Sequence, residues 1–519
     1  MSLRDRLSAA IDRTIEIVAP RKALERKAAR AASEQFGDTY RAAGTTRINH
    51  GWDVSSGSAD YDLLPDLAIL RERSRELLRN DPYAASIVRT MTDNVIGTGI
   101  RPQSNINAEA LSISDEEANQ IRKACEYAWE KWQKNADVAR RMTFYDMQSH
   151  VMRSIITNGE AFVMPVRVER IVSPYDLCLE IIEPDRIEAP NELDQVNGGR
   201  FKRLSGVELG RNGYPAAYWV RVSHPGDGIY ERTKDKRHRR IRAINDQGQP
   251  QILHMMHHTR PGQTRGEPML APVMSSLRSI DKLSEAVTTS ARVAACYSLF
   301  IQKDDPYNAA INRSDETVRG QRLEEISPGL IHYLSPGESV TTGTPPGNSS
   351  ADYNDFLTRH LRAIGAAVGL PIELLEMNMS DSNYSSARGI LIEARRTFNK
   401  WQQYLISHFC EHVYAMVIEE AWLRGEIPYR GDFDAARYEL TRSSWIAPSY
   451  GWVDPLKEVQ AAETAINAGL SSLAAEAAAQ GRDWESVLEQ RAREQAYAEE
   501  LGLRPQQPTP PEEPREDEE

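Results

Sequence analysis

The sharpest catalytic pattern in the 519 residues is a pair of histidines with a glutamate between them. His408, Glu411 and His412 match the H-x-x-E-H pattern of inverted zinc proteases, in which two histidines on one helix face bind zinc. A catalytic zinc also needs a third protein ligand and an open position, and the sequence assigns neither. The three residues fall in a helical pattern crowded with aromatic side chains, so we interpret the match as accidental and keep a zinc-dependent maturation protease as the alternative.

Other catalytic or cofactor patterns are weaker. His254, His257 and His258 cluster in strand-like sequence without a nearby Cys or acidic residue at ligand spacing, and we interpret them as polar residues at a strand end. The chain contains neither the phosphate-binding G-x-x-x-x-G-K-[ST] motif nor the G-x-S-x-G nucleophile motif. We therefore expect a protein that is not an enzyme, with no catalytic residues, no metal site and no cofactor.

One stretch of the sequence carries enough positive charge to bind phosphate. It places seven basic side chains within eleven residues, without an interleaved aromatic ring on which a base would stack. A run of this kind is more often a solvated loop, but a DNA-binding adaptor that acts as a monomer stays a third hypothesis. The residues of this possible phosphate patch are Arg232, Lys234, Lys236, Arg237, Arg239, Arg240 and Arg242.

Composition limits the remaining classes. The formal net charge is -12, which argues against tight, sequence-independent adhesion to a nucleic acid but not against letting one pass along a surface. No apolar run approaches the ~18 residues needed to cross a bilayer, and the charged N-terminal region does not resemble a secretory signal. The four cysteines are scattered, as expected of buried thiols in a reducing compartment.

The hydrophobic pattern alternates between helical and strand periods. Residues 60–267 begin with two helical segments separated at Asp81-Pro82, where Asp81 is the expected cap, and residues 160–260 show the short β-branched segments of a β-rich unit. Helices are expected at 268–299 and 352–375, on either side of a turn-rich insert at 300–351. The predicted fold class is therefore α+β and mainly helical.

The C-terminal part has a different organisation. A polar segment at 376–386 precedes the longest helical pattern, with Ser385 or Ser386 as its expected cap, within a helical region that spans 387–500. The pattern ends at Gly425, which makes the helix roughly 55 to 60 Å long at 1.5 Å per residue. Two tails complete the chain: an amphipathic helix with an extended arm at 1–59, and an acidic, proline-rich tail at 501–519.

Several short motifs, taken in order along the chain, resemble those of the portal proteins of lambda-type tailed bacteriophages. No single motif is specific, but their order along residues 45–490 is. They are LRERSR at 70–75, RNDPY at 79–83, VIGTG at 95–99, EPDR at 183–186, RPGQ at 260–263, RG at 265–266, NYSSAR at 383–388 and DPLKE at 454–458.

The resemblance implies a portal fold with wing, stem, clip and crown. It assigns the wing to 60–267, the two stem helices to 268–299 and 352–375, the clip to 300–351, and the long wing helix with the crown to 387–500. It implies a ring of twelve copies that acts as head-tail connector at the capsid portal vertex of the virion, after assembly in the bacterial cytoplasm. Double-stranded DNA would pass through the ring during packaging and ejection, and the expected partners are the large terminase subunit, the major capsid protein or scaffold, and a head-tail adaptor, with no membrane.

The same resemblance makes residues 376–386 a tunnel loop that projects into the DNA channel. Local chemistry agrees, because the segment has too few apolar groups to pack firmly and little to hold a phosphate. The residues expected to face DNA are Met377, Asn378, Met379, Ser380, Asp381, Ser382 and Asn383.

Overall fold

The computed structural model describes most of the chain beyond residue 53. The described residues are 54, 56–169, 173–190, 193–196, 201–227, 237–295, 299–303, 317–318, 321–322, 338–342, 350–380, 383–449 and 455–501. The chain divides into two compact units, Met1–Ser58 and Ala59–Glu519, and the elements below belong to the second. Most of the expected helix and arm at 1–59, the tail beyond residue 501 and most of the insert at 300–351 lie outside the described residues.

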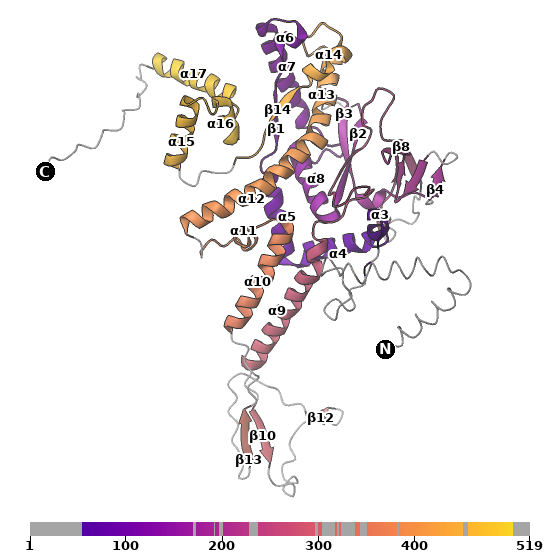
Figure 1. The fold of residues 1–519 in the computed structure, drawn as a ribbon, viewed down its shortest axis with the longest axis vertical. Helices are drawn as coiled ribbons and strands as arrows, with labels where there is room; N and C mark the ends of the chain where they lie inside the picture. The colour runs from indigo at the N-terminus through magenta and orange to yellow at the C-terminus, as the bar shows by residue number, and fades with distance from the viewer. Residues whose placement is uncertain are drawn as a thin grey trace, which may run out of the picture. The chain divides into compact units, whose positions relative to one another are not determined.

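Helices make up most of the described structure (Figure 1). None of the described helices has both the length and the apolar character required to cross a bilayer. The helices are α3 (Ala59–Leu63), α4 (Leu67–Asn80), α5 (Pro82–Val95), α6 (Ala108–Leu111), α7 (Asp115–Gln133), α8 (Phe144–Asn158), η3 (Pro184–Arg186), η5 (Ala271–Val273), α9 (Met274–Ala295), α10 (Ser350–Val368), α11 (Ile372–Glu376), α12 (Tyr384–Leu405), η6 (Ile406–Cys410), α13 (Glu411–Leu423), α14 (Phe433–Leu440), α15 (Pro455–Asn467), α16 (Leu473–Ala479) and α17 (Trp484–Glu500).

Local capping chemistry sets several of these boundaries. The Asp81 side chain accepts a hydrogen bond from the Ala84 N–H at 2.7 Å, and Pro82 occupies the first position of α5, as predicted. Ser114 and Glu117 form a reciprocal capping box at the start of α7. Gly159 ends α8 with a φ of 86°, a left-handed conformation that costs glycine little.

The strands pair antiparallel in five small sheets. The β-rich unit predicted for 160–260 is present, as a three-stranded sheet in the order β3-β2-β9 and a five-stranded sheet in the order β4-β5-β6-β7-β8. The strands are β1 (Arg101–Ser104), β2 (Glu160–Arg167), β3 (Leu177–Ile182), β4 (Leu193–Val196), β5 (Phe201–Leu204), β6 (Val207–Leu209), β7 (Pro215–Arg221), β8 (His238–Arg242), β9 (Leu253–Met256), β10 (Leu299–Lys303), β11 (Thr317–Val318), β12 (Gln321–Arg322), β13 (Glu338–Thr342) and β14 (Ser443–Ile446). Beyond these two sheets, β1 pairs with β14, β10 with β13 and β11 with β12.

An aromatic cluster forms the centre of the main core, where α7, α8, η6 and α13 meet. The ring of Trp129 lies 4.9 Å from that of Phe144 and 5.6 Å from that of Tyr414, and Phe144 lies 5.2 Å from Phe409. The indole N–H of Trp132 donates to the Leu177 carbonyl at 2.9 Å, which ties α7 to strand β3. Aromatic pairs of this kind contribute about 0.5 to 1.5 kcal/mol beyond the area they bury.

A buried ionic cluster joins this helical body to the sheets. The Glu160 carboxylate, at the start of β2, is fully buried and contacts guanidinium groups from two distant segments. Arg265 donates to Glu160 Oε1 at 2.8 Å, and Arg71 of α4 pairs with the same oxygen. His254 of β9 places Nε2 at 2.9 Å from Glu160 Oε2.

Arg265 also holds the five-stranded sheet in place. Its Nη2 donates to the Pro184 carbonyl at 2.9 Å, and its Nη1 donates to the Ile187 carbonyl at 3.1 Å and to the carbonyl of Ser205, between β5 and β6. Next to it, Gly266 lies against the backbone of Gly159, where an added Cβ would be 2.0 Å from the Gly159 carbonyl oxygen. Only glycine at position 266 allows this approach of the two backbones.

Two long helices, α9 and α10, lie side by side (Figure 1). The Ser284 hydroxyl lies 2.9 Å from the Tyr353 hydroxyl between them. These helices correspond to the pair predicted at 268–299 and 352–375, and their chain ends connect to the paired strands β10 and β13. The second helix is shorter than predicted because Gly369, with a φ of 76°, ends α10, and the separate helix α11 follows.

The longest predicted helix is interrupted by one wide turn. Between α12 and α13, residues Ile406–Cys410 form a π-helical turn, which shifts the phase of the following helix. The predicted cap of this helix was wrong: α12 begins one residue after Asn383, whose side chain accepts from the Ser386 N–H at 2.9 Å. Asn is as good an N-cap as Ser, and here its side chain accepts from the N–H of Ser386, one of the two residues expected to be the cap.

We predict that Glu160→Gln strongly destabilises the fold. The substitution leaves two buried guanidinium groups without their carboxylate, and removing one partner of a buried ion pair costs about 3 to 5 kcal/mol. Chemical denaturation at pH 7 measures the loss. As a matched control, Glu393→Gln removes an exposed ion pair with Arg396, 2.9 Å long, and should change stability little.

The difference in folding stability between wild type and Glu160→Gln should depend on pH, in the direction set by the pKa of Glu160. Burial by itself raises the pKa of Glu160, but Arg265 and Arg71 outweigh it and hold that pKa below the ordinary 4.5. The ionised carboxylate therefore stabilises the fold fully above pH 4.5, and this contribution is lost as the pH falls through and below that value. The difference between wild type and Glu160→Gln should shrink at pH 3.5, and a difference that stayed constant would contradict the ionic origin of the effect.

Candidate functional site

The candidate DNA-facing site begins where α11 ends. The Ser86 hydroxyl of α5 donates to the Leu375 carbonyl at 2.7 Å, and the buried Leu375 side chain fixes α11 against α5. Met377 then turns the chain with a φ of 54°, and the N–H of Asn378 donates back to the Glu373 carbonyl at 3.0 Å. This framework holds the start of the segment firmly.

The segment beyond this anchor is exposed and polar. Residues 376–380 and Asn383 are all exposed, including Met377 at 56% and Met379 at 37% of their possible surface. Within it, the N–H of Ser380 donates to the side-chain oxygen of Asn378 at 3.0 Å. Asp381 and Ser382 lie outside the described residues.

The described part of this segment carries negative charge and no positive charge. Among the described residues from Glu376 to Asn383, the only ionisable side chain is that of Glu376, and no lysine or arginine occurs. Attraction to DNA phosphates depends on the number of cationic contacts, so this surface has no means of gripping a passing duplex. Hydroxyl and amide groups can exchange hydrogen bonds with water as a strand moves past.

The predicted phosphate patch at 232–242 lies partly outside the residues that the structure describes. Arg232, Lys234 and Lys236 fall among the residues that are not described, whereas Arg239, Arg240 and Arg242 belong to β8, at the edge of the five-stranded sheet, and Arg237 precedes it. Arg240 donates to Glu208 Oε2 at 2.7 Å, and Arg242 donates to Asp246 at 2.6 Å. These two guanidinium groups are engaged by carboxylates of the same unit, so a phosphate would have to compete for them.

The zinc-protease pattern does not form a ligand group. The π-helical turn contains His408, so its spacing to His412 is not that of a regular α-helix. The His408 ring stacks on Tyr404 with centroids 4.3 Å apart, and its Nδ1 lies 3.0 Å from the Tyr404 carbonyl oxygen. In the described part of the chain, the group of three residues whose ligand atoms lie within 4.8 Å of one another is a different one, Glu183, Asp185 and His224.

That group is better explained as an ion-pair cluster than as a metal centre. Asp185 pairs with Arg75 of α4, and Arg75 Nη2 lies 3.5 Å from Glu183. Burial raises the pKa of Asp185, but its contacts with Arg75 and Arg71 outweigh burial and lower it overall. His224 Nδ1 accepts from the Gly226 N–H at 3.0 Å, so in the neutral ring the proton sits on Nε2, the nitrogen that faces the two carboxylates.

The three histidines at 254–258 separate in the structure. His254 was expected at a polar strand end, and that expectation was wrong: its side chain is only 9% exposed and stacks on Phe162, with ring centroids 4.2 Å apart. Burial lowers the pKa of His254, so the neutral ring is favoured even though Glu160 lies beside it. His257 Nδ1 instead lies 3.1 Å from the Glu267 carbonyl oxygen, and His258 is exposed.

Sequence reasoning did not single out the buried cluster of Arg71, Glu160 and Arg265. One signal was present, because Arg71 lies four residues after Leu67 and three before Ser74, on the buried stripe of α4. A charged residue on an otherwise buried stripe needs a buried partner. Its identity depends on contacts across 89 residues of sequence.

We predict that the purified chain binds no stoichiometric zinc and that Glu411→Gln leaves its thermal stability unchanged, because Glu411 is exposed. Elemental analysis of purified protein and a melting curve of the variant check both statements. One zinc ion per chain that is lost in His408→Ala would overturn this reading and revive the protease hypothesis.

The sequence of this chain is similar to those of several known proteins. The sequence model described as "Phage portal protein, lambda family" matches residues 45–402. The portal protein of Escherichia phage N15 is 26% identical over 481 residues, covering 88% of this chain and 89% of that protein. The probable portal protein of Halomonas phage phiHAP-1 is 29% identical over 465 residues, covering 87% of this chain and 85% of that protein.

Two further comparisons extend these. Portal protein B of Escherichia phage lambda is 26% identical over 480 residues, covering 88% of each chain. Among solved structures, a chain from the neck of a native gene transfer agent particle, computed with C12 symmetry, matches 80% of this chain and 93% of its own with 13% identity and a TM-score of 0.43.

The sequence relationship extends over most of the described fold. The matched range 45–402 includes the β-rich unit, the α9–α10 pair and the exposed segment after α11. It covers more than half of the chain, and the curated relatives match along nearly their whole length. The chain therefore belongs to the lambda family of phage portal proteins.

Proposed function

We propose that this portal protein works as the subunit of a closed ring of twelve copies, the head-tail connector at the capsid portal vertex, through which double-stranded DNA is packaged and later ejected. The observation that carries the proposal is the family match over residues 45–402, supported by portal relatives that align along most of the chain. The role is structural, and the ring provides a passage without doing chemistry on the DNA.

The parts of the proposed ring follow the elements of the chain. The wing corresponds to 60–267, which holds α3 to β9, and the stem to α9 and α10. The clip corresponds to 300–351, where β10 pairs with β13. The tunnel loop is 376–386, and the long wing helix with the crown spans 387–500, from α12 to α17.

Closure of the ring needs two different surfaces that match each other. A head-to-tail interface repeats around a ring when the rotation between copies closes. On α9 the exposed side chains include Asp281 and Glu285, and on α10 they include Arg359 and Arg362. The acidic pair on α9, which lies beside the exposed Arg278 and Lys282, is opposite in charge to the basic pair on α10 and favours the packing of α9 of one copy against α10 of the next.

Passage of DNA needs a firm frame with a non-adhesive lining. The anchor of α11 on α5 supplies the frame, and the exposed segment from Glu376 to Asn383 supplies the lining. Twelve copies repeat at a spacing that does not match the roughly 10 base pairs of a DNA turn, so no single register of the duplex would be a deep trap.

The proposed partners follow from the family. Force for packaging comes from a separate ATPase, the large terminase subunit, which docks on the clip, since the sequence carries no phosphate-binding loop of the P-loop type. The major capsid protein or a scaffold surrounds the ring, and a head-tail adaptor binds after packaging. Assembly takes place in the bacterial cytoplasm, and the mature location is the portal vertex of the virion.

We predict that the purified chain assembles into rings of about twelve copies of the 58.4 kDa subunit. Reversing Asp281 and Glu285 to Arg should lower the ring yield, because like charges would then face each other across each stem contact. Adding Arg359→Glu and Arg362→Glu should restore the yield. Native mass spectrometry measures the yield, and a chain that stayed monomeric under all assembly conditions would contradict the proposal.

We predict that shortening the tunnel loop impairs completion of packaging or retention of the packaged DNA, while rings and capsids still form. Replacing residues 379–382 with Gly-Ser keeps Asn378, which closes the end of α11, and Asn383, which caps α12. Ring formation is read by electron microscopy, and packaging by the amount of nuclease-protected DNA.

The matched control replaces Asp246-Gln247, an exposed turn after β8, with Gly-Ser. This change should affect neither assembly nor packaging. Loss of rings in the loop variant, or normal packaging and retention in it, would show that the loop assignment is wrong.

A further inference from the structure

The C-terminal helices α15, α16 and α17 have no core of their own. Within these three described helices no residue is buried. Large apolar side chains are exposed instead, among them Leu456 of α15 at 70%, Tyr497 of α17 at 62% and Leu501, the C-cap of α17, at 55%. Apolar side chains are more stable when they are removed from water, so a second surface that covered these helices would stabilise them.

A cavity lies beside these helices, between α15–α16 and α12. It has a volume of about 420 Å³, well above the ~150 Å³ that accommodates a benzene molecule. Leu391 and Ile392 of α12 and Ala462 of α15 contribute apolar surface. The cavity therefore has an apolar part of its lining beside its charged residues.

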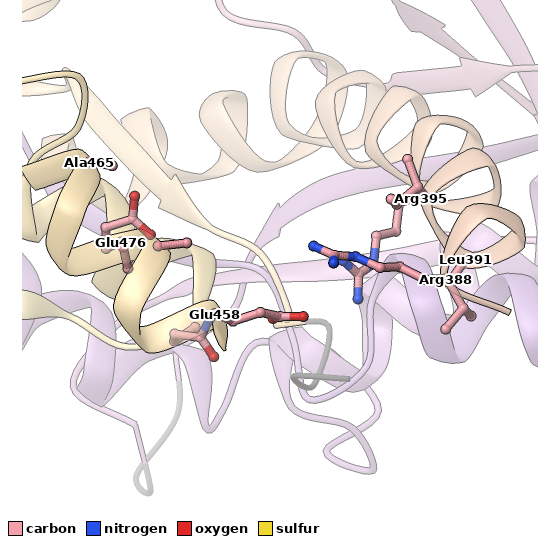
Figure 2. Close-up of a pocket in the computed structure, with 10 residues that line it drawn as sticks. Arg388, Leu391, Arg395, Glu458, Ala465 and Glu476 are labelled. Carbon is pink, nitrogen blue, oxygen red and sulfur yellow. The ribbon is translucent and has the colours of Figure 1, made fainter. Parts of the chain in front are cut away.

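The two walls of the cavity carry opposite charge. Figure 2 shows the guanidinium groups of Arg388 and Arg395 pointing into the space from α12, while Glu458 faces them from α15 and Glu476 lies farther along the opposite wall on α16. A simple anion would meet the glutamates and a simple cation would meet the arginines. The groove matches a segment with an apolar ridge and one charge of each sign on its two sides.

The outer part of α17 has this pattern. Tyr497 and Leu501 are four residues apart and form one ridge, with Arg493 on one side of the ridge and Glu494 on the other at 100° per residue. Residues 488–497 are all exposed, so no described element covers this stretch. If this ridge bound in the groove, Tyr497 and Leu501 would contact its apolar residues. Arg493 would then face Glu458 and Glu476, and Glu494 would face Arg388 and Arg395.

The start of α17 is held on its own chain. Lys123 of α7 pairs with Glu489 at 2.8 Å, and Gln103 donates to Asp483 at 2.6 Å. α17 also contacts α16, and because a helix is stiff, the exposed turns at 488–497 extend beyond these contacts as a rod. The groove and the rod are thus two separate surfaces of one chain, as a head-to-tail contact requires.

We infer that the outer turns of α17 dock in the groove between α12 and α15–α16 of a second copy of this chain. The inference rests on the proposed ring and adds a second contact between subunits, distinct from the stem contact. It is a helix-in-groove interface with an apolar ridge and a charged rim. Because α12 begins at the end of the tunnel loop, the contact would tie the C-terminal helices of one copy to the channel loop of the next.

Cysteine crosslinking between two separate variants tests the contact. Ala462→Cys places a thiol in the groove, and Leu501→Cys places one on the ridge of α17. The two variants are mixed before assembly and then oxidised, and a disulfide-linked dimer should form only in the mixture. Of the four native cysteines, Cys125, Cys178 and Cys410 are buried and Cys296 lies outside the described residues, so wild-type chain carried through the same treatment corrects for any reaction of the native thiols.

Charge reversal tests the orientation. Arg395→Glu should lower the yield of the crosslink several-fold, and adding Glu494→Arg to the partner variant should restore it. The matched control is Arg396→Glu, the neighbouring exposed arginine, which pairs with Glu393 and does not line the cavity. High salt should weaken the rim contacts of the wild-type pair.

The outcomes separate this inference from the ring itself. Rings without the mixed crosslink would overturn the inference and leave the proposed function standing, whereas absence of both rings and crosslink would contradict both. A disulfide within one chain of the Ala462→Cys, Leu501→Cys double variant, without linked oligomers, would show that the helix folds back on its own groove. If removing residues 503–519 abolished the effect of Arg395→Glu, the acidic tail would be the occupant and the inference would be wrong.

Discussion

One buried carboxylate holds together parts of this portal protein that are distant in sequence. Glu160 accepts from Arg265 and pairs with Arg71, and both guanidinium groups are buried with it. Burying ions is expensive, and it is tolerated only when each charge and each remaining N–H finds a partner. Arg265 therefore also donates to the backbone carbonyls of Pro184 in η3, of Ile187 just after η3 and of Ser205 before β6, which places the five-stranded sheet against the helical body.

The same cluster explains why several family motifs are far apart in sequence. The segments at 70–75, 183–186 and 265–266 contribute Arg71 and Arg75, Asp185, and Arg265 with Gly266 to one location. Their order along the chain indicates the family, and their meeting in the fold gives the physical reason for the residue types. An arginine in a helix stripe, an aspartate after a strand and an Arg-Gly pair each look ordinary alone.

In the proposed ring, the helical body holds the exposed segment after α11 in a fixed position beside the DNA passage. The aromatic core of α7, α8, η6 and α13 and the anchor of α11 on Ser86 fix the position from which the exposed segment projects. In the proposed ring, a lining that grips phosphates would stop the duplex, and the described part of the proposed tunnel loop is polar and carries no lysine or arginine. In the C-terminal region, α15 and α17 contain no buried residue, and a groove lies between α12 and α15–α16. Both features fit a chain whose packing is completed by neighbouring copies.

The sequence by itself determined the elements and the family. Asp81, the Ser114 and Glu117 box and Gly159 set helix ends through contacts within four residues, and the short β-branched segments located β2, β3, β7 and β9 of the β-rich unit but not β4, β5, β6 or β8. Only the tertiary structure decided that His254 is buried beside Glu160 and that Arg71 is the ion-pair partner of Glu160. It also decided that a π-helical turn changes the spacing between His408 and His412. Such features depend on which of many possible long-range contacts bury a charge or shift a helix, and a local pattern carries no information about a partner 89 residues away.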